Sequence, residues 1–293
     1  MSDTLKGCAL MVAAMACFAV EDGLIKALAN HIPPGQIIWM LGLGGALVFA
    51  FWLGLRGGGV RSPLYLDRRV LVRSGFEVIG TLFFVSAITT IPLATASAVI
   101  QATPLVVAMG AALVLGARVG WRRWAAIGVG FAGVLVILRP GADSFDPAVL
   151  LAVGATIALS ARDLATRTMP PEISGPRLSL HAFAALVPAG LLLQAVQGQP
   201  VVLPEQGQAT ILALCVIIGV AAYVAIVAAT RLGDIAVVSS LRYSRMVFAL
   251  IIGMVAFSER PDAATLLGVA IIILSGLYTL LREARLARLA SQT

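Results

Sequence analysis

The chain consists largely of long apolar stretches separated by short polar or turn-forming segments, and this alternation limits its fold more than any other feature. A stretch of about 17–25 apolar residues can cross a bilayer as an α-helix. Ten such stretches lie near residues 5–29, 34–55, 70–90, 93–115, 122–139, 147–167, 178–197, 209–230, 235–257 and 263–282. They lack the period-two alternation of barrel strands, and in lipid the backbone must be bonded within helices or a closed barrel. The sequence therefore predicts an all-α membrane protein with ten transmembrane helices.

The composition excludes an ordinary soluble domain. Apolar residues make up 60% of the chain and charged residues 12%, which leaves too little polar surface to cover a domain of 293 residues in water. The net charge of +7 raises the question of a nucleic-acid partner. The basic residues lie between the apolar stretches and form no continuous patch, so we expect a lipid bilayer as the partner and no nucleic acid.

Lysine and arginine also predict the orientation. If the N-terminus is cytoplasmic, 16 of the 21 basic residues fall in cytoplasmic segments, and only Lys26, Arg139 and Arg260 fall outside. Arg242 and Arg245 lie within the ninth stretch. An excess of basic residues marks the cytoplasmic side of a membrane protein. We therefore expect a multi-pass protein of a bacterial-type inner membrane with both termini in the cytoplasm.

The two halves of the chain resemble each other. Leu10–Lys26 matches Leu151–Arg167 at an offset of 141, including an acid four residues before a base, and later segments match at an offset of 142. This predicts two five-helix copies, residues 1–140 and 147–288, which together form one membrane domain. Because five is odd, the second copy must enter the membrane upside down. Inverted repeats of this kind are common in transporters and place the solute site where the copies meet.

Three short motifs resemble a known family. They are Phe18-Ala-Val-Glu-Asp-Gly-Leu-Ile-Lys26, Ile91-Pro-Leu-Ala-Thr-Ala-Ser-Ala98 and Ser258-Glu-Arg-Pro261. With them the chain resembles the drug/metabolite transporter superfamily, specifically its EamA-type members. The resemblance implies a cavity lined by stretches 1, 3, 4, 6, 8 and 9. It also implies similarity to bacterial exporters of aromatic and other amino acids.

Charged residues inside the apolar stretches are candidates for solute binding, because a charge in the bilayer is costly unless it is paired or faces water. Glu77 is expected to bind a solute ammonium or a coupling proton, or else to pair with Arg73 or with an arginine of the ninth stretch. Arg242 and Arg245, with Tyr243 between them, are expected to grip a solute carboxylate. The alternative is that these arginines brace the helices.

Two acid–base pairs are candidate gates. Asp22 and Lys26 lie near the outer end of the first stretch, and Asp163 and Arg167 lie at the inverted position of the sixth. Such pairs can break as each side of a transporter opens. Alternatively, they only anchor and cap helix ends. Glu21 and Arg162 are the corresponding neighbours of opposite charge.

The fourth stretch contains Gln101, Thr103 and Pro104 near its middle. Proline frees the carbonyl four residues earlier, that of Ile100, and either exposes backbone to a solute or merely kinks the helix. The matching position of the ninth stretch, Met246, predicts no such break. Gln101 is therefore a candidate solute ligand.

Aromatic side chains add three further candidates for the solute site. Trp39, Phe83 and Tyr223 can stack on an aromatic solute, or pack against neighbouring helices and the interface.

No cofactor or metal is expected. Cys8, Cys17 and Cys215 sit in apolar surroundings without ligand spacing, and His31 and His181 are isolated in the sequence. No HExxH or GxSxG motif and no phosphate-binding loop of the GxxxxGK[ST] form occurs. The leading hypothesis is a secondary transporter, not an enzyme, that exports amino acids or related metabolites by alternating access. The alternatives are uptake of a metabolite such as a vitamin and, in another class, an intramembrane enzyme or packing subunit.

Overall fold

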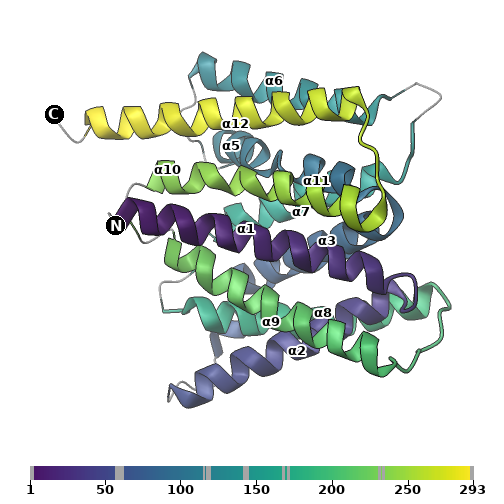
Figure 1. The fold of residues 1–293 in the computed structure, drawn as a ribbon. Helices are drawn as coiled ribbons and strands as arrows, with labels where there is room; N and C mark the ends of the chain where they lie inside the picture. The colour runs from purple at the N-terminus through teal and green to yellow at the C-terminus, as the bar shows by residue number, and fades with distance from the viewer. Residues whose placement is uncertain are drawn as a thin grey trace. The chain divides into compact units, whose positions relative to one another are not determined.

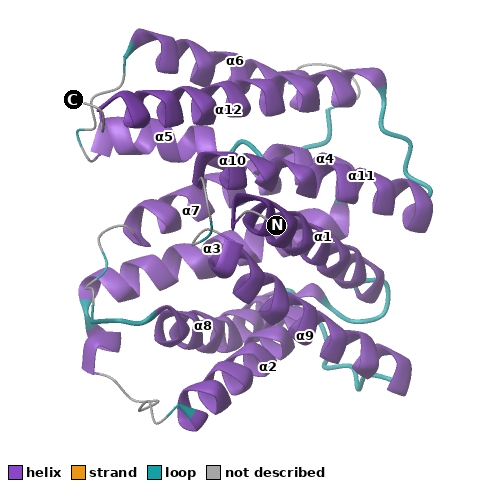
Figure 2. Ribbon diagram, turned by 60° about the vertical axis from the view of Figure 1, so that its left-hand side comes forward, coloured by secondary structure: helices purple, strands orange, loops and turns teal. Residues whose placement is uncertain are grey.

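The structure is a computed structural model and describes residues 3–56, 63–114, 116, 120–140, 145–166, 169, 172–229, 232 and 235–290. Every regular element among these residues is a helix (Figure 2). The α-helices are α1 Asp3–Leu28, α2 Pro34–Leu55, α3 Arg68–Thr90, α4 Leu93–Ile100, α5 Thr103–Val114, α6 Trp121–Leu138, α7 Val149–Thr166, α8 Gly175–Val196, α9 Gln206–Ala229, α10 Ile235–Ser240, α11 Ser244–Phe257 and α12 Ala263–Ala290. Two short 3₁₀ helices, η1 Pro63–Leu66 and η2 Leu241–Tyr243, lie between them.

The helices coincide with the apolar stretches of the sequence. Each stretch corresponds to one helix or to one helix broken in two, α4–α5 and α10–α11. Within the described residues, seven helical segments are long and apolar enough to cross a membrane, and Trp124–Leu138 and Ala263–Thr279 are shorter apolar helices. The prediction of an all-helical, multi-pass membrane protein is therefore confirmed.

Prolines and left-handed residues set several of the helix ends. Pro33 precedes α2 and Pro92 precedes α4, where the missing N–H costs no helical hydrogen bond. Arg139 ends α6 and Ser258 ends α11 with positive φ angles of 48° and 53°. These conformations turn the chain sharply out of the helix, and the turns coincide with the ends of the predicted stretches 122–139 and 235–257.

The helices pack as two compact units, and each is described separately. The first unit comprises Met1–Gly23, Ile91–Val149 and Ile218–Thr293, and the second comprises Leu24–Thr90 and Leu150–Ile217. Each unit therefore contains helices from both halves of the sequence. The repeats seen in the sequence are not themselves the packing units.

In the second unit, α2 packs closely against α8, its counterpart at an offset of 141 (Figure 1). A Cβ on Gly35 would lie 2.7 Å from the backbone nitrogen of Gln194, and a Cβ on Gly42 would lie 2.9 Å from the carbonyl oxygen of Phe183. The start of α2 thus meets the end of α8, so the two helices are antiparallel. Glycine allows this approach, as it does at many helix contacts in membranes.

In the first unit, α6 lies beside α12, its counterpart at an offset of 142 (Figures 1 and 2). A Cβ on Gly133 would lie 2.9 Å from the carbonyl oxygen of Gly268, and Ser275 donates a hydrogen bond to the carbonyl of Ala126. Earlier residues of α6 therefore meet later residues of α12. The helices α6 and α12 are therefore antiparallel, as are α2 and α8.

Candidate functional site

The first unit contains a helix break between α4 and α5. The amides of Gln101 and Ala102 donate to the carbonyls of Ala98 and Val99, three residues earlier, which replaces the α-helical pattern by a tighter turn. Pro104 follows in the first turn of α5. The carbonyl of Ile100, freed by the proline, accepts the hydroxyl of Thr103 at 2.6 Å. The freed group thus has one partner from the chain itself, and its contact with a solute stays a prediction.

A second break separates α10 from α11 at the equivalent place in the other half. Here the 3₁₀ helix η2, Leu241–Tyr243, interrupts the stretch without any proline. The hydroxyls of Ser240 and Ser244 donate to the carbonyls of Val237 and Leu241. Bonds of this kind offer the backbone an alternative to the helical ladder and bend helices. The expectation that only the proline-containing stretch is interrupted was therefore wrong.

The two breaks lie next to each other in the first unit. The side-chain amide of Gln101 donates to the backbone carbonyl of Arg242 across 3.2 Å. Arg242 itself is exposed. The breaks thus bring together unwound backbone, an amide and a guanidinium, which is a suitable set of groups for an anionic or polar solute.

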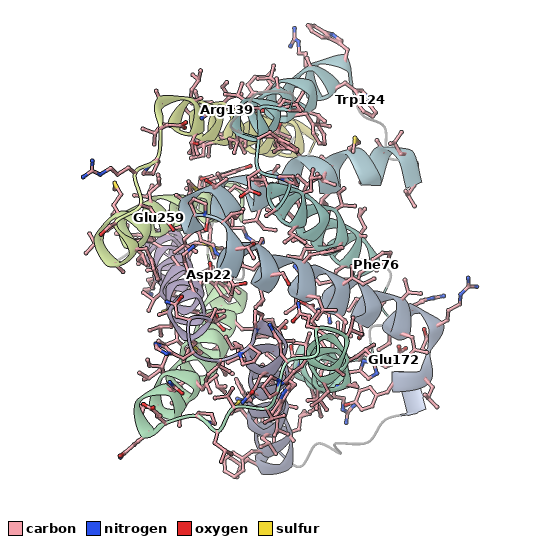
Figure 3. The ribbon with its side chains drawn as sticks, turned by 90° about the vertical axis from the view of Figure 1, so that its right-hand side faces the viewer. Asp22, Phe76, Trp124, Arg139, Glu172 and Glu259 are labelled. Carbon is pink, nitrogen blue, oxygen red and sulfur yellow. The ribbon has the colours of Figure 1, made fainter. Side chains whose placement is uncertain are left out.

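Arg245 is held by an acid from α1. Its Nε and Nη2 both donate to Oδ2 of Asp22, at 3.2 Å and 2.6 Å, and its guanidinium lies 5.2 Å from the ring centre of Phe18. Asp22, which is labelled on α1 in Figure 3, is only 4% exposed. Of the two predicted arginines, Arg245 therefore braces α11 against α1, whereas Arg242 stands exposed at the break.

The two tyrosines predicted for the solute site lie in different surroundings. Tyr243 is 5% exposed, and its hydroxyl sits against Gly276 of α12. It is packed between helices and does not face an open surface. Tyr223 on α9 is half-buried.

In the second unit, Glu77 lies between two arginines. Its Oε2 accepts from Arg73 at 2.9 Å, as the four-residue spacing suggested, and its Oε1 accepts from Arg162 of α7 at 2.9 Å. Arg162 also bonds to Asp163 at 2.7 Å. The charges of Arg73 and Arg162 thus balance those of Glu77 and Asp163. Of the two alternatives for Glu77, the structure shows the ion pair. The additional partner comes from α7 and not from the ninth stretch.

The candidate gates are only partly described. Lys26 donates to the carbonyl of Ile88 at the end of α3, at 3.1 Å. Asp163 is bonded to its neighbour Arg162, with 37% of its side chain exposed. Arg167 lies outside the described residues. Among the described residues, Asp22 pairs with Arg245, Asp163 pairs with Arg162, and Lys26 binds a backbone carbonyl.

The aromatic candidates of the second unit contact other helices. The indole nitrogen of Trp39 donates to the side-chain oxygen of Gln194 at 3.0 Å, which fixes α2 to α8. Phe83 is 39% exposed, and its ring covers Gly154 of α7. Both therefore have packing roles whether or not a solute reaches them.

Sequence reasoning missed the role of Glu259. Its carboxylate accepts the backbone N–H groups of Leu93 and Ala94, at 2.6 Å and 3.1 Å, and so caps the start of α4 from the link between α11 and α12 (Figure 3). A cavity of about 350 Å³ lies beside it, lined also by Arg139, Arg260 and Asp262. The motif Ser258–Pro261 was visible in the sequence, but its partner 166 residues earlier in the chain was not.

The described residues contain no group of three or more His, Cys, Asp or Glu side chains placed to hold a metal ion. The sequence motifs, the helix breaks and the paired charges are all compatible with passage of a solute through a membrane. Comparisons with known proteins support a function in transport.

The family model described as the EamA-like transporter family matches residues 5–139 and again 146–281. The chain is 28% identical to a riboflavin transporter of Rhizobium johnstonii, over 83% of this chain and 78% of that protein. It is 29% identical to an S-adenosylmethionine uptake transporter of Rickettsia conorii, over 67% and 66%. It is 30% identical to a pseudopaline exporter of Pseudomonas aeruginosa, over 93% and 95%. One crystal structure shares its fold with a TM-score of 0.63 and 21% identity, covering 97% of both chains.

Proposed function

Since the chain belongs to the EamA-like transporter family, we propose that it is a secondary transporter that exports a small carboxylate-bearing metabolite, such as an amino acid or a derivative of one, by alternating access. The observation that carries this proposal is the meeting of two helix breaks in the first unit, bridged by the bond from Gln101 to the carbonyl of Arg242. Broken helices of repeated transporters characteristically surround the solute.

The proposal includes an inverted arrangement of the two copies, residues 1–140 and 147–288, with ten spans and both termini in the cytoplasm. Antiparallel packing supports it, because α2 with α8 and α6 with α12 are equivalent pairs. Inversion turns one member of each pair upside down, whereas a direct repeat keeps equivalent helices parallel. The excess of lysine and arginine in the segments assigned to the cytoplasm supports the orientation.

Arg242 is the proposed ligand for the solute carboxylate. It projects from a helix break, it is exposed, and a guanidinium binds a carboxylate through two parallel hydrogen bonds. Gln101 at the facing break supplies an adjacent amide. The ion pair of Arg245 with Asp22 holds α11 against α1 beside this site. Tyr223, half-buried on α9, and the partly exposed Phe83 and Trp39 remain proposals for contact with an apolar part of the solute.

A second candidate is uptake of a vitamin or a nucleotide-derived metabolite. The observation that favours it is the similarity to riboflavin and S-adenosylmethionine uptake transporters. Export is the leading proposal because the relative that covers 93% of this chain and 95% of its own length is an exporter.

The proposal is tested by counterflow with the purified protein in lipid vesicles. Labelled amino acids, opine-like amino-acid conjugates, riboflavin and S-adenosylmethionine are offered in parallel, each against a trapped excess of the unlabelled compound. Arg242→Ala should weaken the apparent affinity for a carboxylate-bearing solute by about 10- to 100-fold, as expected for loss of a charged hydrogen-bond pair. Arg68→Ala, which removes another exposed arginine, is the matched control. If no member of the panel exchanges, or if Arg242→Ala behaves like Arg68→Ala, the assignment is wrong.

A further inference from the structure

Glu21 is an acidic residue of α1 that forms no ion pair with any basic side chain the structure describes. Its neighbour Asp22 binds Arg245 through both Nε and Nη2, so that pair is already electrically balanced. Among the residues that the structure describes, no basic side chain lies within ion-pair distance of Glu21. The local cluster of Glu21, Asp22 and Arg245 therefore carries one negative charge in excess.

The Glu21 carboxylate rests directly on the backbone of α9. A Cβ on Gly219 would lie 2.6 Å from Oε1 and 3.0 Å from Oε2 of Glu21. Any side chain at position 219 would have to displace the carboxylate. Glycine thus leaves room for the acid and at the same time supplies no group to neutralise it.

The second unit shows what the equivalent place holds when the charges are balanced. An offset of 141 relates Glu21 to Arg162, and an offset of 142 relates Glu77 to Gly219. In the second unit Arg162 and Glu77 form an ion pair at 2.9 Å. The corresponding place in the first unit contains an acid opposite a glycine. The contact between α3 and α7 in the second unit therefore contains an ion pair. The equivalent contact between α1 and α9 in the first unit contains the acid Glu21 opposite a glycine.

An acid without a base in an apolar span has a strong tendency to take up a positive charge, because an isolated carboxylate is costly there. The charged groups that act on Glu21 are Asp22 on α1 and Arg245 on α11. Lys26, further along α1, donates to the carbonyl of Ile88, and α9 contributes the neutral side chains of Cys215 and Tyr223, each four residues from Gly219. None of these groups forms an ion pair with Glu21. A proton fits the narrow space over Gly219, which has no room for a side chain.

We propose that Glu21 is a proton-binding site and that its protonation drives solute movement. The step is the addition of one proton from water on one side of the membrane to a carboxylate oxygen, and its return to water on the other side. No electron transfer or bond to the solute is involved. Proton binding stands on the geometry of Glu21 alone, whereas its coupling to solute movement rests on the proposed transport function.

Proton binding is tested on the purified protein without any solute. Difference infrared spectroscopy during a pH titration should show a band of a protonated carboxyl group in the parent, and this band should be lost in Glu21→Gln. Glu21→Asp should retain a titrating band, which separates the acid from the packing of the side chain. Glu205→Gln removes an exposed acid and is the matched control. A titration of Glu21→Gln identical to that of the parent overturns the proposal.

Coupling is tested in vesicles with an imposed pH difference. One pH unit corresponds to about 1.4 kcal/mol, which supports about tenfold accumulation if one proton accompanies or exchanges with each solute. The parent and Glu205→Gln should approach this value, and Glu21→Gln should not accumulate solute above equilibrium. If the parent exchanges solute but the pH difference causes no accumulation, the proposed coupling is wrong, although the proposed transport function stands. If no solute moves at all, the transport function fails, and the infrared titration still decides whether Glu21 binds a proton.

Discussion

Gly190→Ala should loosen the contact between α2 and α8. A Cβ at this position would lie 2.6 Å from the carbonyl oxygen of Gly35, 2.6 Å from the backbone nitrogen of Trp39 and 2.9 Å from its Cβ. Two of these neighbours are backbone atoms, so no side-chain rotation relieves the clash. The helices must move apart, and the hydrogen bond from Trp39 to Gln194 is strained at the same time.

The expected cost follows from this geometry. Overpacking of a close contact typically costs about 1–3 kcal/mol. At about 2–4 °C for each kcal/mol in a chain of this size, the melting temperature in detergent should fall by about 2–12 °C. In the assay, the purified protein is heated to a series of temperatures. Size-exclusion chromatography then measures the fraction that remains folded at each temperature.

Gly54→Ala is the matched control on α2, because no atom lies within 4 Å of a Cβ at that position. Alanine has the higher helix propensity, so this variant should be unchanged or more stable by up to about 1 kcal/mol. Equal melting temperatures for Gly190→Ala and Gly54→Ala would refute the close antiparallel contact.

Four further substitutions test the charged contacts. Asp22→Asn should lower stability by about 1–3 kcal/mol, because it removes the acid bonded to Arg245 and leaves only Glu21 to balance the guanidinium, and a melting temperature within error of the parent would contradict that pairing. Glu77→Gln should destabilise the protein in thermal unfolding more than Asp163→Asn, since Asp163 is 37% exposed and such pairs contribute at most about 1 kcal/mol; the opposite ranking would contradict the assignment. Asp262→Ala should cost about 1 kcal/mol, because Asp262 accepts the Thr265 N–H at the start of α12. Arg139 donates a hydrogen bond to Asp262 and holds the pKa of this carboxyl well below its usual value, so the stability difference should persist above about pH 4 and shrink as the pH falls further. A difference that instead grows in acid would contradict it.

The helices could be predicted from the sequence because lipid imposes a simple rule. Each apolar stretch must satisfy its backbone groups internally, so its length and the turn residues beside it define a helix. The predicted stretch 34–55 and helix Pro34–Leu55 share their bounds for this reason. The break before Pro104 also had a visible cause.

The second break and the charge partners could not be predicted in the same way. The 3₁₀ helix Leu241–Tyr243 contains neither glycine nor proline, and its only local signal is the pair of serines that flank it. The pairing of Asp22 with Arg245 joins residues 223 positions apart. By contrast, Glu77 and Arg73 are one helical turn apart, and their pairing was among the alternatives weighed. Local spacing is visible in a sequence, whereas partners brought together by the fold are not.

The inverted arrangement of the two copies is the claim on which the proposed solute path depends, and its most direct test compares His31 with Glu172. These exposed residues are separated by the repeat offset of 141, and both lie in the second unit. Each is replaced by cysteine in a variant whose Cys8, Cys17 and Cys215 are changed to alanine, and labelling by a membrane-impermeant thiol reagent is measured in intact and in permeabilised cells. The account predicts that position 31 is labelled from outside and position 172 only after permeabilisation. Labelling of both positions from the same side would contradict it.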